Sequence, residues 1–378
     1  MREMPKRSGL VLTLFSLLLS TAGARDLQGA ASEGIGSGRS LPGYEFLSPK
    51  APEDRAYLGI LHRKAFTIAD IQADLVVLEI LNTYCTSCQK QAPFYNTVFH
   101  MLEKDPATRG WIKWIGEAVG NNEREVASFR RERAVPFPIL ADEDFGFYDA
   151  LTGPSGARTP LTILLRRDEG GRAIIVESHV GFRGDTEEIS RSIKAALEHR
   201  PASLKIRQGE ATVPPLAKRL PPPLSEQELS ERIKTGISID GAYVLEIRRI
   251  RLAGGDIYVA KVEKGSHQEE LFAVPVSRPP VCDICHGIRF IYIFDKGGTV
   301  RNFIPVDLRK YGNRSWDDQD INQMRDRLLG RSLIEPFKFN RGVDAVTRAT
   351  ITSVVIFAAM NKGKALYTDL ARKNYIRK

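Results

Sequence analysis

The chain has few cysteines and no long block of like charge, and each shortage excludes a class of protein. Only four cysteines occur in 378 residues, which is too few for a scaffold held together by disulfides. The 55 basic and 46 acidic residues give a net charge of +9, but the two signs are mixed along the chain, as in Arg130-Arg131-Glu132-Arg133. A diffuse surplus of this kind does not predict a nucleic-acid groove, so we expect no nucleic-acid partner.

Apolar segments long enough to cross a membrane are also lacking. The run Leu10–Leu19 is too short to span a bilayer comfortably, and Ile351–Met360 is shorter than a transmembrane helix. Basic residues precede the first run, and the small residues Ala22-Gly23-Ala24 follow it. This pattern is typical of a secretory signal peptide over residues 1–24, with an uncleaved anchor helix as the alternative. We therefore expect an exported protein on the periplasmic or extracellular side of the membrane.

Two stretches of biased composition divide the remaining chain into two domains. Residues 25–43 are rich in glycine, serine and alanine, and residues 201–223 are rich in proline. Both compositions are typical of linkers, and the second favours a stiff, extended spacer. The sequence thus predicts one domain over residues 44–200 and another over residues 224–378.

The first domain alternates predicted strands and helices. Residues 74–81 are almost continuously apolar, as expected for a strand buried on both faces. Further strands are predicted over 111–119, 137–140, 161–166 and 173–180, and helices over 88–103, 122–133 and 185–199. This alternation predicts an α/β sandwich.

The cysteine pair Cys85-Thr86-Ser87-Cys88 lies where the first buried strand gives way to a helix. Backbone N–H groups at a helix N-terminus stabilise a thiolate, so this position activates the first cysteine. The second cysteine lies one turn along, where it can resolve a mixed disulfide. We therefore expect Cys85 to be exposed and nucleophilic, and Cys88 to be deeper and less reactive.

These features resemble the thioredoxin superfamily, in particular the exported thiol–disulfide oxidoreductases of cytochrome maturation. Tyr84 takes the aromatic position before the first cysteine, and Thr159-Pro160 matches the cis-proline that faces the dithiol. The resemblance implies a thioredoxin-like domain over 44–200, with Cys85 as nucleophile, Cys88 as resolving cysteine and Glu79 as proton acceptor. It also implies client proteins with cysteines or disulfides as partners, and no cofactor for the dithiol chemistry. Thr86 and Ser87 differ from the Gly-Pro of general thioredoxins, so the redox direction stays open.

The second domain is β-rich and ends in a helical segment. Strands are predicted over 243–252, 257–264, 288–294 and 300–305, and helices over 317–329 and from 344 onward. We expect the acidic residues Asp317, Asp318 and Asp320 to cap the helix over 317–329. A bound cation at these residues is the alternative.

The segment 344–353 resembles the signature of FMN-binding domains in sodium-pumping and related electron-transport complexes. In that family a threonine carries FMN through a phosphoester, and Thr350 occupies its position. Asp344 and Thr347 match further signature positions, whereas Arg348 replaces a glycine and could pair with a phosphate. The resemblance implies an α+β FMN-binding-like domain over about 240–365, with FMN as cofactor and a membrane electron-transport complex as partner. A helix that only packs against the core is the alternative.

The second cysteine pair, Cys282-Asp-Ile-Cys285-His286, matches the attachment motif of c-type haem. A redox-active dithiol, a structural disulfide and a metal site remain alternatives, although no metal ligand set is predicted. The leading hypothesis is an exported thiol–disulfide oxidoreductase coupled to a flavin or to this second dithiol. The competing hypotheses are an electron-transfer flavoprotein or c-type cytochrome, and a binding protein whose disulfides are only structural.

Overall fold

The computed structural model describes residues 35–153, 156–198, 224–238, 241–252, 255–282 and 285–376. The predicted signal peptide over 1–24 and the proline-rich linker over 201–223 lie outside the described residues. The described residues all belong to one compact unit. Within the described ranges, no helix combines the length and apolar character that a membrane crossing requires.

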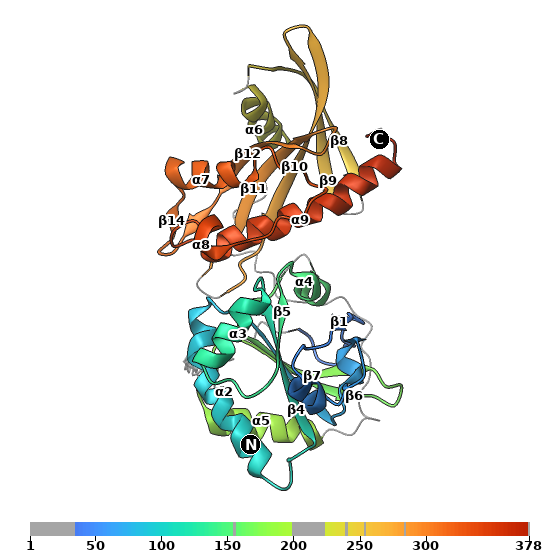
Figure 1. The fold of residues 1–378 in the computed structure, drawn as a ribbon, viewed down its shortest axis with the longest axis vertical. Helices are drawn as coiled ribbons and strands as arrows, with labels where there is room; N and C mark the ends of the chain where they lie inside the picture. The colour runs from blue at the N-terminus through green and yellow to red at the C-terminus, as the bar shows by residue number, and fades with distance from the viewer. Residues whose placement is uncertain are drawn as a thin grey trace, which may run out of the picture. The chain divides into compact units, whose positions relative to one another are not determined.

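The N-terminal half is built on a five-stranded sheet in the order β5-β4-β3-β6-β7 (Figure 1). Its strands are β3 (Leu75–Leu81), β4 (Ile112–Val119), β5 (Ile139–Asp142), β6 (Leu161–Arg167) and β7 (Ala173–Val180). β3, β4 and β5 run parallel, and β6 and β7 are antiparallel to their neighbours. The small strands β1 (Phe46–Leu47) and β2 (Ala65–Phe66) pair separately.

Helices cover this sheet, and the central strand is buried along its whole length. The helices are α1 (Pro52–Leu58), α2 (Thr86–Lys104), α3 (Glu123–Glu132), α4 (Gly146–Thr152) and α5 (Thr186–Glu198). Alternate residues of β3 enter different apolar clusters: Val76, Leu78 and Ile80 in one, Leu75, Val77 and Leu81 in the other. The strand order, with a CxxC helix after the central strand, gives a thioredoxin-like fold and confirms the predicted α/β architecture. The helices α1 and α4 were not predicted.

The C-terminal half is a five-stranded antiparallel sheet in the order β12-β11-β10-β9-β8, packed with helices (Figure 1). Its strands are β8 (Tyr243–Leu252), β9 (Gly255–Lys264), β10 (His267–Arg278), β11 (Ile288–Asp295) and β12 (Val300–Asp307). Its helices are α6 (Glu226–Ser238), α7 (Asp318–Leu328), α8 (Arg341–Asp344) and α9 (Thr350–Arg372). The short strands β13 (Arg309–Lys310) and β14 (Arg314–Ser315) form a hairpin. The β-rich character is confirmed, while β10 and α6 were not predicted.

Two predicted helix boundaries in this half are settled by local geometry. Asp317 caps α7 through a reciprocal pair of hydrogen bonds with Asp320, which is the predicted capping role of the acidic group. The prediction of one continuous last helix from 344 is wrong, because the chain breaks between α8 and α9. Arg348 lies in this break with a φ of 62°, in the left-handed region that interrupts a helix.

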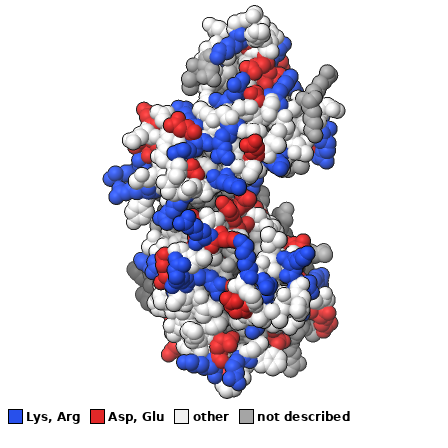
Figure 2. All heavy atoms as spheres, in the orientation of Figure 1, with Lys and Arg blue, Asp and Glu red and all other residues white. Residues whose placement is uncertain are grey.

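The two halves contact each other through specific polar and close-packed groups. Asp149 on α4 accepts from Arg278 at 2.9 Å and also pairs with Lys362 of α9. Asn361 of α9 donates to Asp144 at 2.6 Å. A Cβ on Gly156 would lie 2.5 Å from Pro279 Cγ, so only glycine allows this approach. Figure 2 shows basic and acidic side chains interspersed over the visible face, as the mixed sequence pattern indicates.

Candidate active site

The turn between β3 and α2 is held by side-chain hydrogen bonds that place Cys85 at the start of the helix. Asn82 donates to the carbonyl of Val119 at 2.7 Å and accepts from the N–H of Tyr84 at 2.9 Å. The N–H of Cys85 donates to the carbonyl of Asn82 at 3.0 Å. The turn is thereby anchored to the neighbouring strand β4, which fixes Cys85 as the N-cap residue of α2.

Both cysteines of this pair are thiols, and both are buried. The N–H of Cys88 donates to Cys85 Sγ at 3.5 Å, an interaction that favours the thiolate of Cys85. The expectation that Cys85 is exposed is wrong, since its exposed fraction is 0%, against 1% for Cys88. Cys282 packs into the same apolar cluster as Cys85 and Cys88 and contributes to this burial. Burial raises the pKa of Cys88 well above its usual range, and the adjacent Cys85 raises it further.

Glu79 lies in the middle of β3, with only 4% of its surface exposed. Its Oε1 accepts from Gln91 Nε2 at 3.0 Å, and Gln91 in turn accepts from the N–H of Arg183 at 2.9 Å. Burial raises the pKa of Glu79 to about 7. Its charge also contributes to the raised pKa of Cys88. A carboxyl group that titrates near neutrality beside a thiol is suited to accept a proton from it.

The peptide bond Thr159–Pro160 is cis and lies directly beside the dithiol. Cys85 Sγ donates to the carbonyl of Thr159 at 3.7 Å. Residues 74 positions apart in the chain therefore meet at one site. The structure brings together Cys85, Cys88, Glu79 and this peptide bond, which are the four site elements named from the sequence.

A segment of the C-terminal half completes the site, and sequence reasoning did not place it there. The N–H of Thr159 donates to the carbonyl of Val281 at 2.8 Å, and Thr159 forms a parallel β-bridge with Cys282. Cys282 is fully buried and forms a disulfide with Cys285. The recurrence of the CxxC spacing was the only signal in the sequence that could have suggested this contact.

The haem hypothesis concerns the same two sulfurs. Haem c requires both sulfurs of the motif as thioethers, and a sulfur in a disulfide cannot form one. His286 is half-buried and leads within two residues into β11, so it is tied to the sheet. While the two sulfurs are joined, Cys282 and Cys285 offer no thiol to a haem, and haem attachment at this motif stays a prediction.

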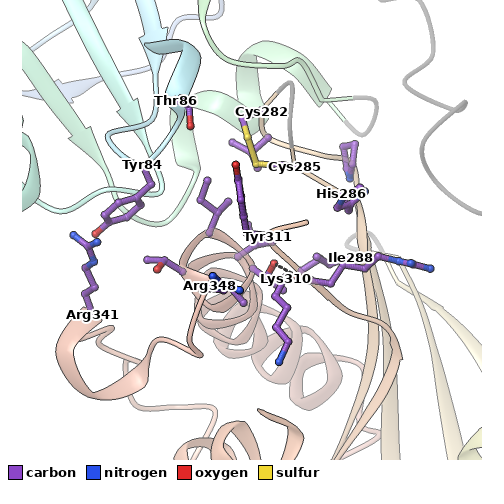
Figure 3. A pocket seen from close by; sticks show the side chains of 18 of the residues that line it. Tyr84, Thr86, Cys282, Cys285, His286, Ile288, Lys310, Tyr311, Arg341 and Arg348 are labelled. Carbon is purple, nitrogen blue, oxygen red and sulfur yellow. Dashed lines mark hydrogen bonds between the residues drawn. A yellow bond between two sulfur atoms is a disulfide. The ribbon is translucent and has the colours of Figure 1, made fainter. Parts of the chain in front are cut away.

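A pocket of about 290 Å³ lies beside the disulfide (Figure 3). Its lining combines Tyr84, Thr86 and Gln89 with residues of the C-terminal half, including Cys285 and Thr350. Four basic side chains also line it: Arg309, Lys310, Arg341 and Arg348. Figure 3 shows Arg341 reaching toward Tyr84, and its guanidinium lies 4.6 Å from the ring centroid.

The residues of the FMN-type signature divide into supporting and pocket-lining groups. Thr352 donates to the carbonyl of Arg309 at 2.9 Å, and Ser353 accepts from the N–H of Val346 at 3.1 Å. Asp344 accepts from the N–H of Asn340 at 2.7 Å. Those three residues therefore stabilise the break between α8 and α9.

Thr350 belongs to the pocket-lining group. It is half-buried, and its hydroxyl makes no hydrogen bond within the described residues. Thr347 and Arg348 are exposed beside it. Arg348 adopts the left-handed backbone that the signature's glycine would favour. The local conformation thus leaves the Thr350 hydroxyl available to a ligand.

Comparisons with known proteins return matches only among solved structures. No family model matches the chain, and no curated protein matches it. A thiol:disulfide interchange protein of the thioredoxin family from Chlorobium tepidum is 16% identical, with 42% of this chain and 96% of that chain covered, at a TM-score of 0.30. A secreted Mycobacterium tuberculosis disulfide oxidoreductase homologous to E. coli DsbE is 19% identical, with coverages of 35% and 88% and a TM-score of 0.28. StoA from Bacillus subtilis is 17% identical, with coverages of 40% and 97% and a TM-score of 0.29. Similarity at this level assigns no activity to this chain.

The raised pKa of Glu79 predicts a pH dependence of stability. Its value of about 7 lies above the ordinary 4.5, so the folded state favours the protonated acid. The protonated acid therefore adds about 3 kcal/mol to the free energy of unfolding. This stabilisation is complete below pH about 4.5 and is lost as the pH rises through 7. Glutamine does not titrate, so the free energy of unfolding of Glu79→Gln should not fall over this pH range. Relative to the wild type, the variant should become more stable between pH about 5 and 8. Urea unfolding of the reduced proteins measures this difference.

The same substitution should slow the step in which Cys88 loses its proton. We expect release of a mixed disulfide to slow roughly 100-fold near neutral pH, because a general base is lost. Glu117 on β4 is the matched control, since burial also raises its pKa but it lies outside the dithiol site. Glu117→Gln should alter the pH dependence of stability and leave the release rate unchanged. Equal release rates in all three proteins would exclude Glu79 as the proton acceptor.

Proposed function

We propose that the protein is an exported thiol–disulfide oxidoreductase with Cys85 and Cys88 as its redox-active pair. One observation carries this proposal. Cys85 Sγ lies at the N-terminus of α2, accepts from the N–H of Cys88 and contacts the carbonyl of Thr159 beside Pro160. This geometry activates one sulfur, holds a second within one helical turn, and places backbone groups where a peptide can pair.

The mechanism follows from the roles that these positions allow. The Cys85 thiolate attacks a disulfide of a client protein, and one client sulfur leaves as a thiolate. Cys88 then transfers its proton to Glu79 and attacks Cys85 Sγ, which releases the second client sulfur. The client gains two electrons, and the pair becomes a disulfide. The reverse sequence oxidises a client dithiol, so the direction depends on the relative reduction potentials.

The proposed export of the protein is supported by the predicted signal peptide over residues 1–24. An exported location supplies client proteins in which disulfides persist. The proposed partners are therefore exported proteins with cysteines or disulfides. The mixed surface charge gives no support for a nucleic-acid partner.

Cysteine substitutions should separate attack from resolution. Cys88→Ser should accumulate mixed disulfides with client proteins, because attack survives while resolution is lost. Cys85→Ser should trap no client and should lose insulin-reducing activity. The measurement is non-reducing electrophoresis of acid-quenched samples, with mass spectrometry of the trapped species.

The contrast between the two variants controls for general effects of losing a cysteine. Both side chains are buried and differ by one atom from serine, so unequal trapping reports on chemistry. If both variants kept insulin-reducing activity, or if Cys85→Ser trapped clients as well as Cys88→Ser, the assignment of Cys85 as nucleophile would be wrong.

A second candidate function, flavin binding, is supported by the pocket beside the disulfide. Its volume of about 290 Å³ is close to the lower end of ligand sites. The available Thr350 hydroxyl suits a phosphoester, and Arg348 suits a phosphate charge, so the residues present fit FMN. We propose that Thr350 and Arg348 hold the phosphate group, with Asp344 and Thr347 shaping the turn that presents them. A bound flavin would supply electron transfer beside Cys285.

The flavin proposal predicts an absorption signature that depends on Thr350. Protein purified from the periplasm should show paired near-ultraviolet and blue bands. With covalent attachment, the colour should remain with acid-precipitated protein and be absent in Thr350→Val. With binding through Arg348 alone, the colour should be released by acid and be lost in Arg348→Glu. Protein that is colourless and takes up no added FMN would contradict the proposal without affecting the role of Cys85.

A further inference from the structure

The segment Pro279–Cys282 occupies the edge of the dithiol site where a client peptide would pair. Its carbonyl at Val281 accepts from the N–H of Thr159, and its next residue, Cys282, forms the β-bridge with Thr159. A strand added to an exposed edge through main-chain hydrogen bonds is a common mode of peptide recognition. Here the added residue carries a disulfide sulfur.

We propose that the Cys282–Cys285 disulfide is an internal substrate of the Cys85–Cys88 dithiol. The inference rests on the proposed function and names a redox partner within the same chain. Two observations carry it: the main-chain pairing at Thr159, and the packing of Cys282 with Cys85 and Cys88 in one buried cluster. The two cysteine pairs are also in complementary redox states, because Cys85 and Cys88 are thiols while Cys282 and Cys285 form a disulfide.

The exchange balances without any further reagent. The Cys85 thiolate attacks Cys282 Sγ, the Cys282–Cys285 bond breaks, and Cys285 leaves as a thiolate. Cys88 then passes its proton to Glu79 and attacks Cys85 Sγ, which releases Cys282 as a thiolate. Two electrons move from the first pair to the second. The Cys88 proton ends on Glu79, and Cys282 and Cys285 end as thiolates, so atoms, electrons and charge balance.

The surroundings of the two sulfurs decide which one is attacked. Both cysteines line the basic pocket, but Cys282 is fully buried in the cluster that holds the dithiol, whereas Cys285 is only partly buried. Arg341 and Arg348 line the same pocket, and nearby positive charge stabilises a departing thiolate. Attack at Cys282 with Cys285 as leaving group therefore fits the charge distribution.

The same docking controls access to Cys85. With an exposed fraction of 0%, Cys85 cannot meet an external protein while Pro279–Cys282 remains in place. The docked segment continues from Arg278, which pairs with Asp149 at 2.9 Å and lies over the Phe145 ring. A positive charge at Asp149 would repel both Arg278 and Lys362, and so loosen the segment.

The decisive experiment traps the mixed disulfide in the full chain. In the double variant C88S/C285S the remaining cysteines are Cys85 and Cys282. Mild oxidation with diamide should join them in most molecules, as identified by non-reducing peptide mapping. Because the reaction is intramolecular, its rate should not change over a roughly tenfold dilution. Retained unfolding cooperativity confirms that the variant is folded.

A charge-reversal pair tests the docking separately. Asp149→Lys should speed alkylation of Cys85 in the reduced protein about tenfold, since it removes two ion pairs and adds repulsion. Asp168→Lys is the matched control, because Asp168 pairs with Arg172 in a turn remote from the cysteines. The control should alkylate at the wild-type rate.

The outcomes distinguish this inference from the proposed function. If C88S/C285S gives only dimers or unlinked thiols while Cys88→Ser still traps clients, the internal substrate is excluded and the oxidoreductase stands. If neither variant forms any mixed disulfide, the proposed function itself fails. Alkylation at equal rates in Asp149→Lys, Asp168→Lys and wild type would exclude the docked segment as the barrier to Cys85.

Discussion

The hydrogen bond from the N–H of Thr159 to the carbonyl of Val281 is the contact on which the site depends. It brings the Cys282–Cys285 disulfide to the dithiol and closes the edge where a peptide would pair. The burial of Cys85, the packing of Cys282 and the position of the pocket beside Cys285 all follow from it. Gly156, which admits Pro279, and Asp149, which holds Arg278, support the same contact from the side.

Both cysteines are buried, so the asymmetry of the dithiol comes from the hydrogen bond at the start of α2. Cys85 receives the N–H of Cys88 at the start of α2, whereas Cys88 lies within the core with a raised pKa. Desolvation also raises the pKa of Glu79 to about 7. The hydrogen bond that its carboxylate accepts from Gln91 holds the side chain in place. An acid and a thiol that each lose solvation next to one another can exchange a proton at low cost near neutral pH.

The local sequence predicted many of the helices and strands, but not which of them come into contact in the fold. The largely apolar runs that became β3, β4 and β6 were identified within one or two residues, because burial on both faces requires continuous hydrophobicity. Cys85, Cys88, Glu79 and Pro160 were found because their spacing resembles a known active site. The burial of Cys85 was missed, since it depends on Cys282 almost 200 residues away. The break at Arg348 was missed although the signature that this segment resembles carries a glycine there, a residue that favours the left-handed conformation.

The most direct test of the account follows one disulfide within the wild-type chain. Fully reduced protein is given one oxidising equivalent of diamide, quenched with acid over time, alkylated and mapped by mass spectrometry. The account predicts that the disulfide redistributes between Cys85–Cys88 and Cys282–Cys285 until a constant ratio is reached, at a rate unaffected by dilution. A distribution that stays as it was at mixing, or that changes only at high protein concentration, would contradict it.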